Sequence, residues 1–216
     1  MDARQRKTRA KLADVILRLA AERPASELTV SEITIAAGIN RSTFYQHAAS
    51  PMELLESVLR EELDSIRNRF LPVASNTAVP LAAGAGASDV VSPVSPSAVW
   101  DVTAAVIEHV GSHSALYSRA LGASSGASSL HPLLSRHFAE SVTQLLSQHG
   151  VTIPRGDSPN VATDAFVAES AARFVADGTV GAIEVWLRTP EPRSVDSFLE
   201  VYTLIVPAWL PIAPPR

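Results

Sequence analysis

The sequence predicts an all-α protein. Apolar residues recur at spacings of three and four along most of the chain, and helix-capping signals stand where those patterns begin and end. No run alternates apolar and polar residues between turn signals, which is the pattern typical of a strand. Apolar residues make up 46% of the 216 positions, which is enough for a packed core.

The first helix is predicted over residues 3–23. It ends at the Arg23-Pro24 pair, because a residue that precedes proline avoids helical backbone angles. Its apolar residues share one face: Leu12, Val15, Ile16 and Leu19.

Two short helices are predicted next. Thr29 and Glu32 form a capping box that begins the first, and Gly38 ends it, because glycine readily adopts left-handed backbone angles. Asn40 is a good N-cap for the second, over residues 41–47. Two short helices joined by so tight a turn indicate a helix-turn-helix.

A long helix is predicted from Pro51 to about Phe70. Ser50 is its N-cap, Pro51 occupies its first position, and Glu53 stands at its third. Residues 71–97 are then rich in Ala, Ser, Pro, Val and Gly, which predicts a flexible linker or loop. Further helices are predicted over 98–111, 113–120, 130–149, 161–188 and 194–210.

The charge is uneven along the chain. The net charge is −4, but residues 1–50 hold eight Lys and Arg against five Asp and Glu, whereas the remainder holds ten against seventeen. A basic amino-terminal module on an acidic body favours a protein that contacts phosphate at one end only, the alternative being an ordinary solvated terminus. We therefore predict two domains, 1–50 and 51–216.

The second short helix is rich in side chains that form hydrogen bonds. In a helix-turn-helix this helix lies in the major groove of DNA and the first crosses above it. Arg41 and Gln46 can contact base edges, and Thr43 and Tyr45 suit phosphate oxygens. Phe44 is the exception among these side chains, because it is apolar. It is expected to pack in the core of the domain with Ile33, Ala36 and Ile39. The predicted DNA contacts are Arg4, Arg6, Lys7, Arg9, Thr29, Arg41, Ser42, Thr43, Tyr45, Gln46 and His47.

A resemblance to the TetR family of repressors is carried by the stretch from Leu28 to His47, which reads LTVSEITIAAGINRSTFYQH. It extends over about residues 4–63 and includes both helices, the turn and both caps. It implies an amino-terminal DNA reader followed by a larger helical domain that binds a ligand and dimerises through its last two long helices. Two residues depart from the family pattern: Ala48 replaces an aromatic residue, and Pro51 replaces a lysine that touches a phosphate.

The stretch 161–188 is apolar on more than one side, because its charged residues occupy a narrow sector. One side can pack within its own domain, and another needs a partner. A twofold dimer presents two reading helices to a near-palindromic DNA operator; a monomer with one larger core is the alternative. The predicted interface residues are Ala171, Gly178, Gly181, Ala182, Val185, Phe198, Tyr202, Ile205 and Trp209.

A ligand pocket is expected among the helices of the larger domain. The domain has few Lys and Arg, which favours an apolar or weakly polar small molecule over a polyanion. Each candidate residue is otherwise plain core or a surface histidine. The candidates are Trp100, His109, His113, Tyr117, His137, Phe138 and Phe166.

Enzymatic and metal-binding readings receive little support. The chain has no Cys, which excludes thiol nucleophiles and Cys-ligated zinc. Residues 122–126 match the G-x-S-x-G pattern, but no strand precedes them. His109 and His113 stand four apart without an acidic ligand pair, so we predict a surface pair, no metal and no cofactor. With neither a signal peptide nor a membrane span visible, a cytoplasmic protein is expected.

The sequence thus predicts a ligand-responsive transcriptional regulator that is not an enzyme, namely a homodimeric repressor that a small molecule releases from its operator. The alternative is a helical small-molecule-binding dimer that has lost DNA binding, which Ala48 and Pro51 favour. A third alternative is a helical hydrolase, which would need Ser124 of the G-x-S-x-G match as its nucleophile.

Overall fold

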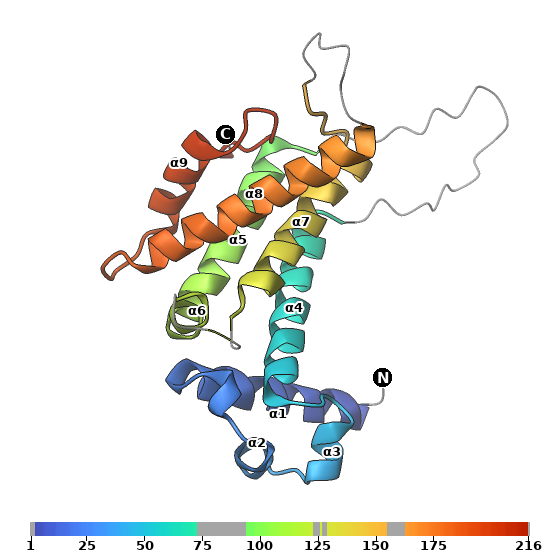
Figure 1. Ribbon diagram of the computed structural model, residues 1–216, viewed down its shortest axis with the longest axis vertical. Helices are drawn as coiled ribbons and strands as arrows, with labels where there is room; N and C mark the ends of the chain where they lie inside the picture. Colours follow the sequence, from blue (N-terminus) through green and yellow to red (C-terminus); the bar gives the residue numbers. More distant parts are fainter. Residues whose placement is uncertain (1–2, 73–93, 123–125, 127–128, 155–162, 216) are drawn as a thin grey trace, which may run out of the picture.

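A computed structural model describes residues 3–72, 94–122, 126, 129–154 and 163–215. Within these residues every regular element is a helix, as predicted. The helices form two lobes, a small one at the amino terminus and a larger one that ends near the carboxyl terminus (Figure 1). None of the described helices is long and apolar enough to cross a membrane.

The small lobe contains three α-helices and one turn of 3-10 helix. The predicted capping box is present: Thr29 Oγ1 accepts from the Glu32 N–H at 3.3 Å, and the Glu32 carboxylate accepts from the Thr29 N–H at 2.9 Å. Gly38 has a φ of 63° and ends the helix in left-handed geometry. Asn40 Oδ1 accepts from the Thr43 N–H at 2.8 Å. The elements are α1 (Ala3–Glu22), η1 (Ala25–Glu27), α2 (Val30–Ala37) and α3 (Arg41–Tyr45).

One helix, α4 (Pro51–Phe70), rises from the small lobe into the large one (Figure 1). Ser50 Oγ caps it by accepting from the Glu53 N–H at 3.1 Å. The residues that α4 buries lie three and four apart, so they share one face. They are Leu54, Leu55, Val58, Leu59 and Leu63.

The helix predicted over 98–111 begins two residues earlier in the structure. Ser95 Oγ accepts from the Ala98 N–H at 3.1 Å and caps a helix whose first residue is Pro96. Residues 73–93 of the predicted linker and 123–125 and 127–128 of the predicted loop, with Ser124, lie outside the described residues. The helices of this lobe are α5 (Pro96–Ser112), α6 (Ser114–Leu121), α7 (His131–Gln148), α8 (Asp164–Leu187) and α9 (Val195–Ile205).

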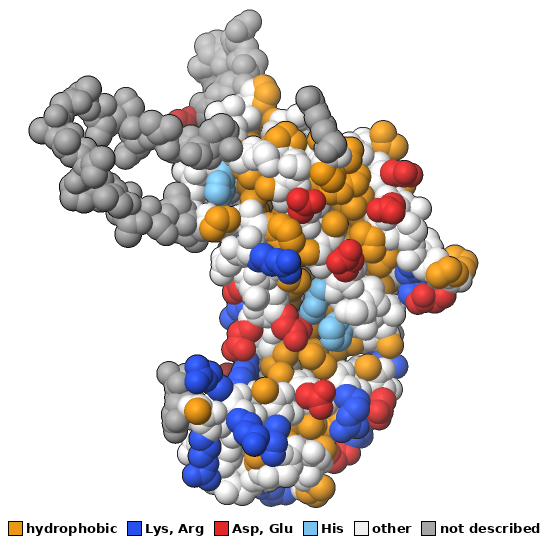
Figure 2. All heavy atoms as spheres, turned by 180° about the vertical axis from the view of Figure 1, so that it is seen from behind, with side chains coloured by type: hydrophobic (Ala, Val, Ile, Leu, Met, Phe, Trp, Pro, Cys, Tyr) orange, Lys and Arg blue, Asp and Glu red, His pale blue; other side chains and the backbone are white. Residues whose placement is uncertain are grey.

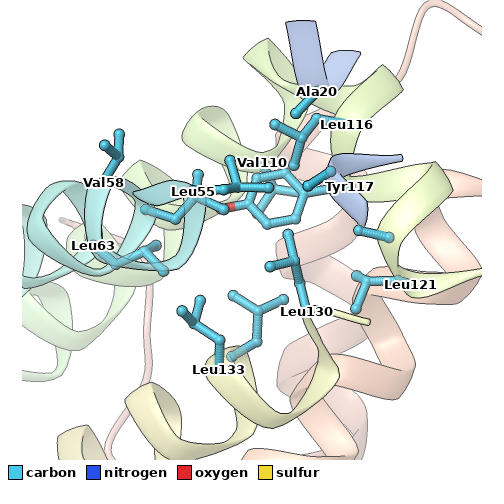
Figure 3. Packing of buried hydrophobic residues seen from close by; sticks show 14 of the residues in the cluster. Ala20, Leu55, Val58, Leu63, Val110, Leu116, Tyr117, Leu121, Leu130 and Leu133 are labelled. Atoms are coloured by element: carbon cyan, nitrogen blue, oxygen red, sulfur yellow. The ribbon is translucent and has the colours of Figure 1, made fainter. Parts of the chain in front are cut away.

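A single buried cluster runs from α1 through α4 into the large lobe. Figure 3 shows its centre, where the ring of Tyr117 on α6 lies among side chains from α1, α4 and α5. A second cluster, which includes Val99, Val142 and Val175, fills the far end of the lobe. The small lobe is therefore fixed to the large one by continuous packing.

The packing around Phe44 differs in one detail from the prediction. Phe44 is fully buried with Ile33, as expected, but Ala36 is exposed and Ala37 is buried in its place. Residues four apart share a helix face, and Ala37 is the residue four positions after Ile33.

Candidate DNA interface and effector cavity

Helix α3 presents polar side chains to solvent. Arg41, Ser42, Tyr45 and Gln46 are exposed, whereas Phe44 points inward. Two further predicted contacts, Thr43 and His47, are half-buried. Because α3 is anchored by one fully buried ring and capped by Asn40, its polar side chains are held on a firm support.

Two of the predicted DNA contacts have hydroxyls that bond to residues of the helix caps. Ser42 Oγ donates to Asn40 Oδ1 at 2.8 Å, and Thr29 Oγ1 donates to the Glu32 carboxylate at 2.7 Å. Arg23 makes an ion pair with the same carboxylate. The bonds from Thr29, followed by the bond from Arg23, lower the pKa of Glu32 to about 2, so the cap stays ionised at neutral pH.

The basic residues of α1 divide into two groups. Arg4, Arg6 and Lys7 are exposed. The prediction that Arg9 contacts DNA receives no support, because its guanidinium binds the Glu61 carboxylate at 2.7 Å and Ser57 Oγ at 2.8 Å on α4. Its side chain is only 14% exposed. Figure 2 shows Lys and Arg side chains gathered over the small lobe.

The two departures from the TetR pattern are accommodated without a gap in the fold. Ala48 is buried in the main core cluster, so the smaller side chain is packed. Pro51 is the first residue of α4, a position where its missing N–H costs nothing.

An apolar cavity lies between α5, α7 and α8 in the large lobe. It holds about 70 Å³ of free space. Its polar hydroxyls are already bonded to backbone carbonyls one turn earlier: Thr103 to Val99 at 2.7 Å, Ser141 to His137 at 2.8 Å, and Thr179 to Val175 at 2.7 Å. The remaining lining residues are Leu71, Val99, Val102, Val106, Ile107, His137, Phe138, Val142, Leu145, Val175, Tyr202 and Leu210.

His137 connects this cavity to α4. Its ring is 4% exposed, and Nδ1 lies 3.3 Å from Asp64 Oδ1. Asp64 accepts from Arg67 at 2.8 Å, and Arg67 also lies 3.6 Å from Glu140. Burial, followed by the positive charge of Arg67, holds the pKa of His137 below its ordinary value, although Asp64 acts in the opposite direction.

Two of the seven predicted ligand residues, His137 and Phe138, line the cavity. Trp100 and His113 are half-buried outside its lining, and Phe166 is exposed.

The other two predicted ligand residues belong to the core between α4, α5 and α6. Tyr117 is fully buried, and its hydroxyl lies 3.0 Å from His109 Nε2. Burial raises the pKa of the Tyr117 hydroxyl. The predicted surface histidine pair is thus wrong for His109, whose side chain is 10% exposed. Burial, with a smaller effect of His113, lowers the pKa of His109 to about 4.

Helices α8 and α9 expose apolar side chains. Among the predicted interface residues Gly178, Val185 and Ile205 are exposed, and Ala171, Gly181, Ala182 and Trp209 are half-buried. Phe198 and Tyr202 are buried in the protomer's own core, so they offer no outward surface. A Cβ placed on either Gly178 or Gly181 meets nothing within 4 Å. The interface prediction left out four large apolar side chains that are exposed on the same two helices: Phe166, Phe174, Val201 and Leu204.

Arg119 on α6 ties the large lobe to the small one. Its guanidinium donates to the backbone oxygens of Ala20 and Ala21 at 3.2 and 2.7 Å. These carbonyls stand in the last turn of α1, where a helix has no partners of its own for them. The sequence carried no signal for this contact, because it joins residues about a hundred positions apart.

The family model described as bacterial regulatory proteins of the tetR family matches residues 12–58. No curated protein matches the chain in sequence. Solved structures match along nearly the whole chain. The fatty acid degradation regulator FadR from Bacillus halodurans aligns with a TM-score of 0.57 at 14% identity, covering 93% of this chain and 95% of its own.

Two further structures agree. Thermus thermophilus FadR, a TetR-family repressor solved in complex with lauroyl-CoA, aligns with a TM-score of 0.54 at 18% identity over 92% of each chain. A tetR-family regulator from Streptomyces coelicolor aligns with a TM-score of 0.52 at 20% identity, covering 94% of this chain and 84% of its own. At these identities the structures show the fold. Residues 12–58 carry the amino-terminal signature of the tetR family of bacterial regulatory proteins, and the described chain shares its fold with these solved regulators.

Proposed function

We propose that this protein is a homodimeric regulator that binds a near-palindromic operator and is released from it by a small apolar or weakly polar molecule. The observation that carries the proposal is α3, whose exposed polar side chains stand on a capped and fully buried support within the family signature. The reader comprises residues 1–50, and residues 51–216 bind the ligand and form the dimer.

The roles within the reader follow from side-chain chemistry. Arg41 and Gln46 contact base edges, because both can form paired hydrogen bonds with them. Phosphate contacts fix the orientation of the protein on the duplex without reading its sequence. They are assigned to Arg4, Arg6, Lys7, Thr29, Ser42, Thr43, Tyr45 and His47.

The exposed apolar side of α8 and α9 supports dimerisation. Phe174, Gly178 and Val185 follow one another along one side of α8, and Leu204 and Ile205 are exposed on α9. Glycines without close neighbours in the protomer let a partner helix approach closely. We propose that a twofold dimer formed through this surface presents two copies of α3 to half-sites about one helical turn apart.

The apolar cavity supports the effector class. Thermus thermophilus FadR is described with lauroyl-CoA, whose acyl chain is apolar, although its coenzyme A part is a polyanion. The free space of about 70 Å³ lies well below the roughly 300 Å³ or more of a typical ligand pocket. A ligand therefore binds only by moving α7 and α8 away from α5. Helix α4 moves with them, because it packs against both α5 and α7. Such coupling is typically worth about 1–3 kcal/mol.

The test is selection of bound duplexes from a random-sequence pool, with the wild-type protein and two variants. The wild type is expected to select a near-palindrome. Arg41→Ala should relax the preference at one base pair of each half-site, whereas Tyr45→Phe should weaken binding to all sequences alike. If Arg41→Ala left the sequence preference unchanged, α3 would not be the helix that lies in the major groove. If a folded dimer selected no motif, the result would favour the second candidate, a ligand-binding dimer without DNA binding. Two observations support that candidate: Pro51 stands at the start of α4, and Arg9 is paired with Glu61.

A further inference from the structure

Helix α1 ends with a carbonyl that its own backbone cannot satisfy. In an α-helix the oxygen of Ala20 would accept from the N–H of residue 24, but that residue is Pro24, which has no N–H. Ala20 is buried, and a buried carbonyl without a partner is unfavourable. The end of α1 therefore needs a donor from elsewhere in the protein.

Arg119 of α6 supplies that donor. Its Nη1 donates to the Ala20 oxygen at 3.2 Å and to the Ala21 oxygen at 2.7 Å. The positive guanidinium also faces the negative end of the helix dipole of α1. Hydrogen bonds depend on direction, whereas apolar packing does not, so this contact fixes where the end of α1 lies relative to α6.

Helix α1 has a second polar attachment, which lies closer to its beginning. The guanidinium of Arg9 binds Glu61 and Ser57 on α4. The helix is thus attached to α4 in its first half and to α6 in its last turn. An attachment to α4 alone would let the small lobe turn about that helix, and the contact with α6 opposes this rotation.

Helix α6 also connects the small lobe with the proposed dimer surface. It packs against both α1 and α8, and α8 carries the exposed Phe174 and Val185 of that surface. Figure 1 shows α6 at the end of the large lobe that faces α1. In a twofold dimer formed through α8 and α9, the distance between the two small lobes therefore depends on how α6 holds α1.

We propose that Arg119 is a positioning residue that sets the distance and angle between the two DNA readers of the dimer, and thereby the half-site spacing that the dimer accepts. The inference rests on the proposed function and adds a determinant of its specificity. Arg119 acts through α1, which packs against α2 of the helix-turn-helix. Without its bonds each reader turns more freely, and the dimer accepts a wider range of spacings.

The experiment measures the affinity of full-length wild type and Arg119→Met for a selected duplex, and for the same duplex with base pairs inserted between its half-sites. Each inserted base pair turns one half-site by about 34° relative to the other. One or two insertions should weaken wild-type binding about tenfold or more, because either the DNA or the dimer must deform. The loss should be less than about threefold in Arg119→Met, whose readers adapt without straining the DNA.

Methionine keeps an apolar stem of similar length but has no donor, so the variant removes the bonds while retaining much of the packing. Arg119→Ala serves if Arg119→Met does not fold. Arg136→Met is the matched control, because Arg136 is an exposed arginine on α7, and it should show the wild-type loss. A variant that was merely less stable would bind both duplexes more weakly by the same factor.

A second measurement needs no DNA. The chain has no cysteine, so Ile35→Cys on the exposed side of α2 gives one spin label per protomer. Pulsed electron paramagnetic resonance should show a narrow distribution of label-to-label distances in this background and a broader one when Arg119→Met is added. An equal width in both, or an equal loss of affinity on insertion in wild type and Arg119→Met, would overturn the role of Arg119. A wild type that binds both duplexes equally would instead refute the paired reading of half-sites in the proposed function.

Discussion

Replacing Leu204 with serine removes the most exposed apolar side chain on the α8–α9 surface. Leu204 is 84% exposed in the protomer, so nearly all of it is available for burial by a partner. Burying a leucine side chain contributes about 2 kcal/mol, and a twofold interface buries two copies, which gives about 4 kcal/mol. At about 1.4 kcal/mol per factor of ten, the dimer dissociation constant should rise roughly a thousandfold.

Sedimentation equilibrium over a wide range of protein concentrations measures that constant. The matched control is Ile35→Ser, because Ile35 is 78% exposed but lies on α2, in the small lobe. This control should leave the dimer unchanged. If Leu204→Ser and Ile35→Ser had the same dissociation constant as the wild type, the α8–α9 surface would not be the interface.

Three further predictions concern the reader, the contact between the lobes and pH. Phe44→Ala should lower the free energy of unfolding by about 3–5 kcal/mol, measured by urea denaturation, because it empties a fully buried site in the reader; a change below about 1 kcal/mol would contradict the packing. Arg119→Ala should accelerate amide hydrogen exchange at the end of α1, whereas Arg136→Ala, an exposed arginine on α7, should not; equal rates in both would mean that the bonds to Ala20 and Ala21 do not hold the lobes together. His109 has a folded-state pKa of about 4 against 6.5 when unfolded, so its contribution is complete above pH 6.5 and is lost as pH falls toward 4; denaturation at several pH values should show this loss, and His109→Gln should flatten it.

The small lobe was largely predictable because its signals are local. The capping box at Thr29, the left-handed Gly38 and the Asn40 cap each involve residues within a few positions of one another, and the structure contains all three. The same signals do not report which side of a short helix faces inward when several neighbours are apolar. The sequence pattern therefore predicts a buried Ala36, whereas the structure buries Ala37.

The large lobe was predictable in its helices but not in its cavity. The cavity is lined by α5, α7 and α8 and also by Leu71 and Leu210, which follow the ends of α4 and α9. These two residues are far apart in the sequence, so only tertiary packing brings them to the same cavity. Periodicity identified α8 as apolar on several sides but could not separate the exposed Phe174 from the buried Val175. For the same reason Tyr202 was placed on the interface, although its hydroxyl lies 2.7 Å from Thr179 in the core.

Charge counts had a similar limit. They indicated a basic amino terminus, but they could not show that Arg9 is held by Glu61 while Arg6 remains exposed. Which basic residues are available for DNA depends on neighbours about fifty positions away in the sequence.

The central claim, that a twofold dimer reads two half-sites, is tested most directly by the affinity for a selected duplex before and after one half-site is scrambled. Salt concentration is held constant, because phosphate contacts make affinity strongly salt-dependent. Each mismatched base pair costs about 1–3 kcal/mol, so loss of one half-site should weaken binding about a hundredfold or more. Equal affinity for the intact and the scrambled duplex would contradict a dimer that reads both half-sites.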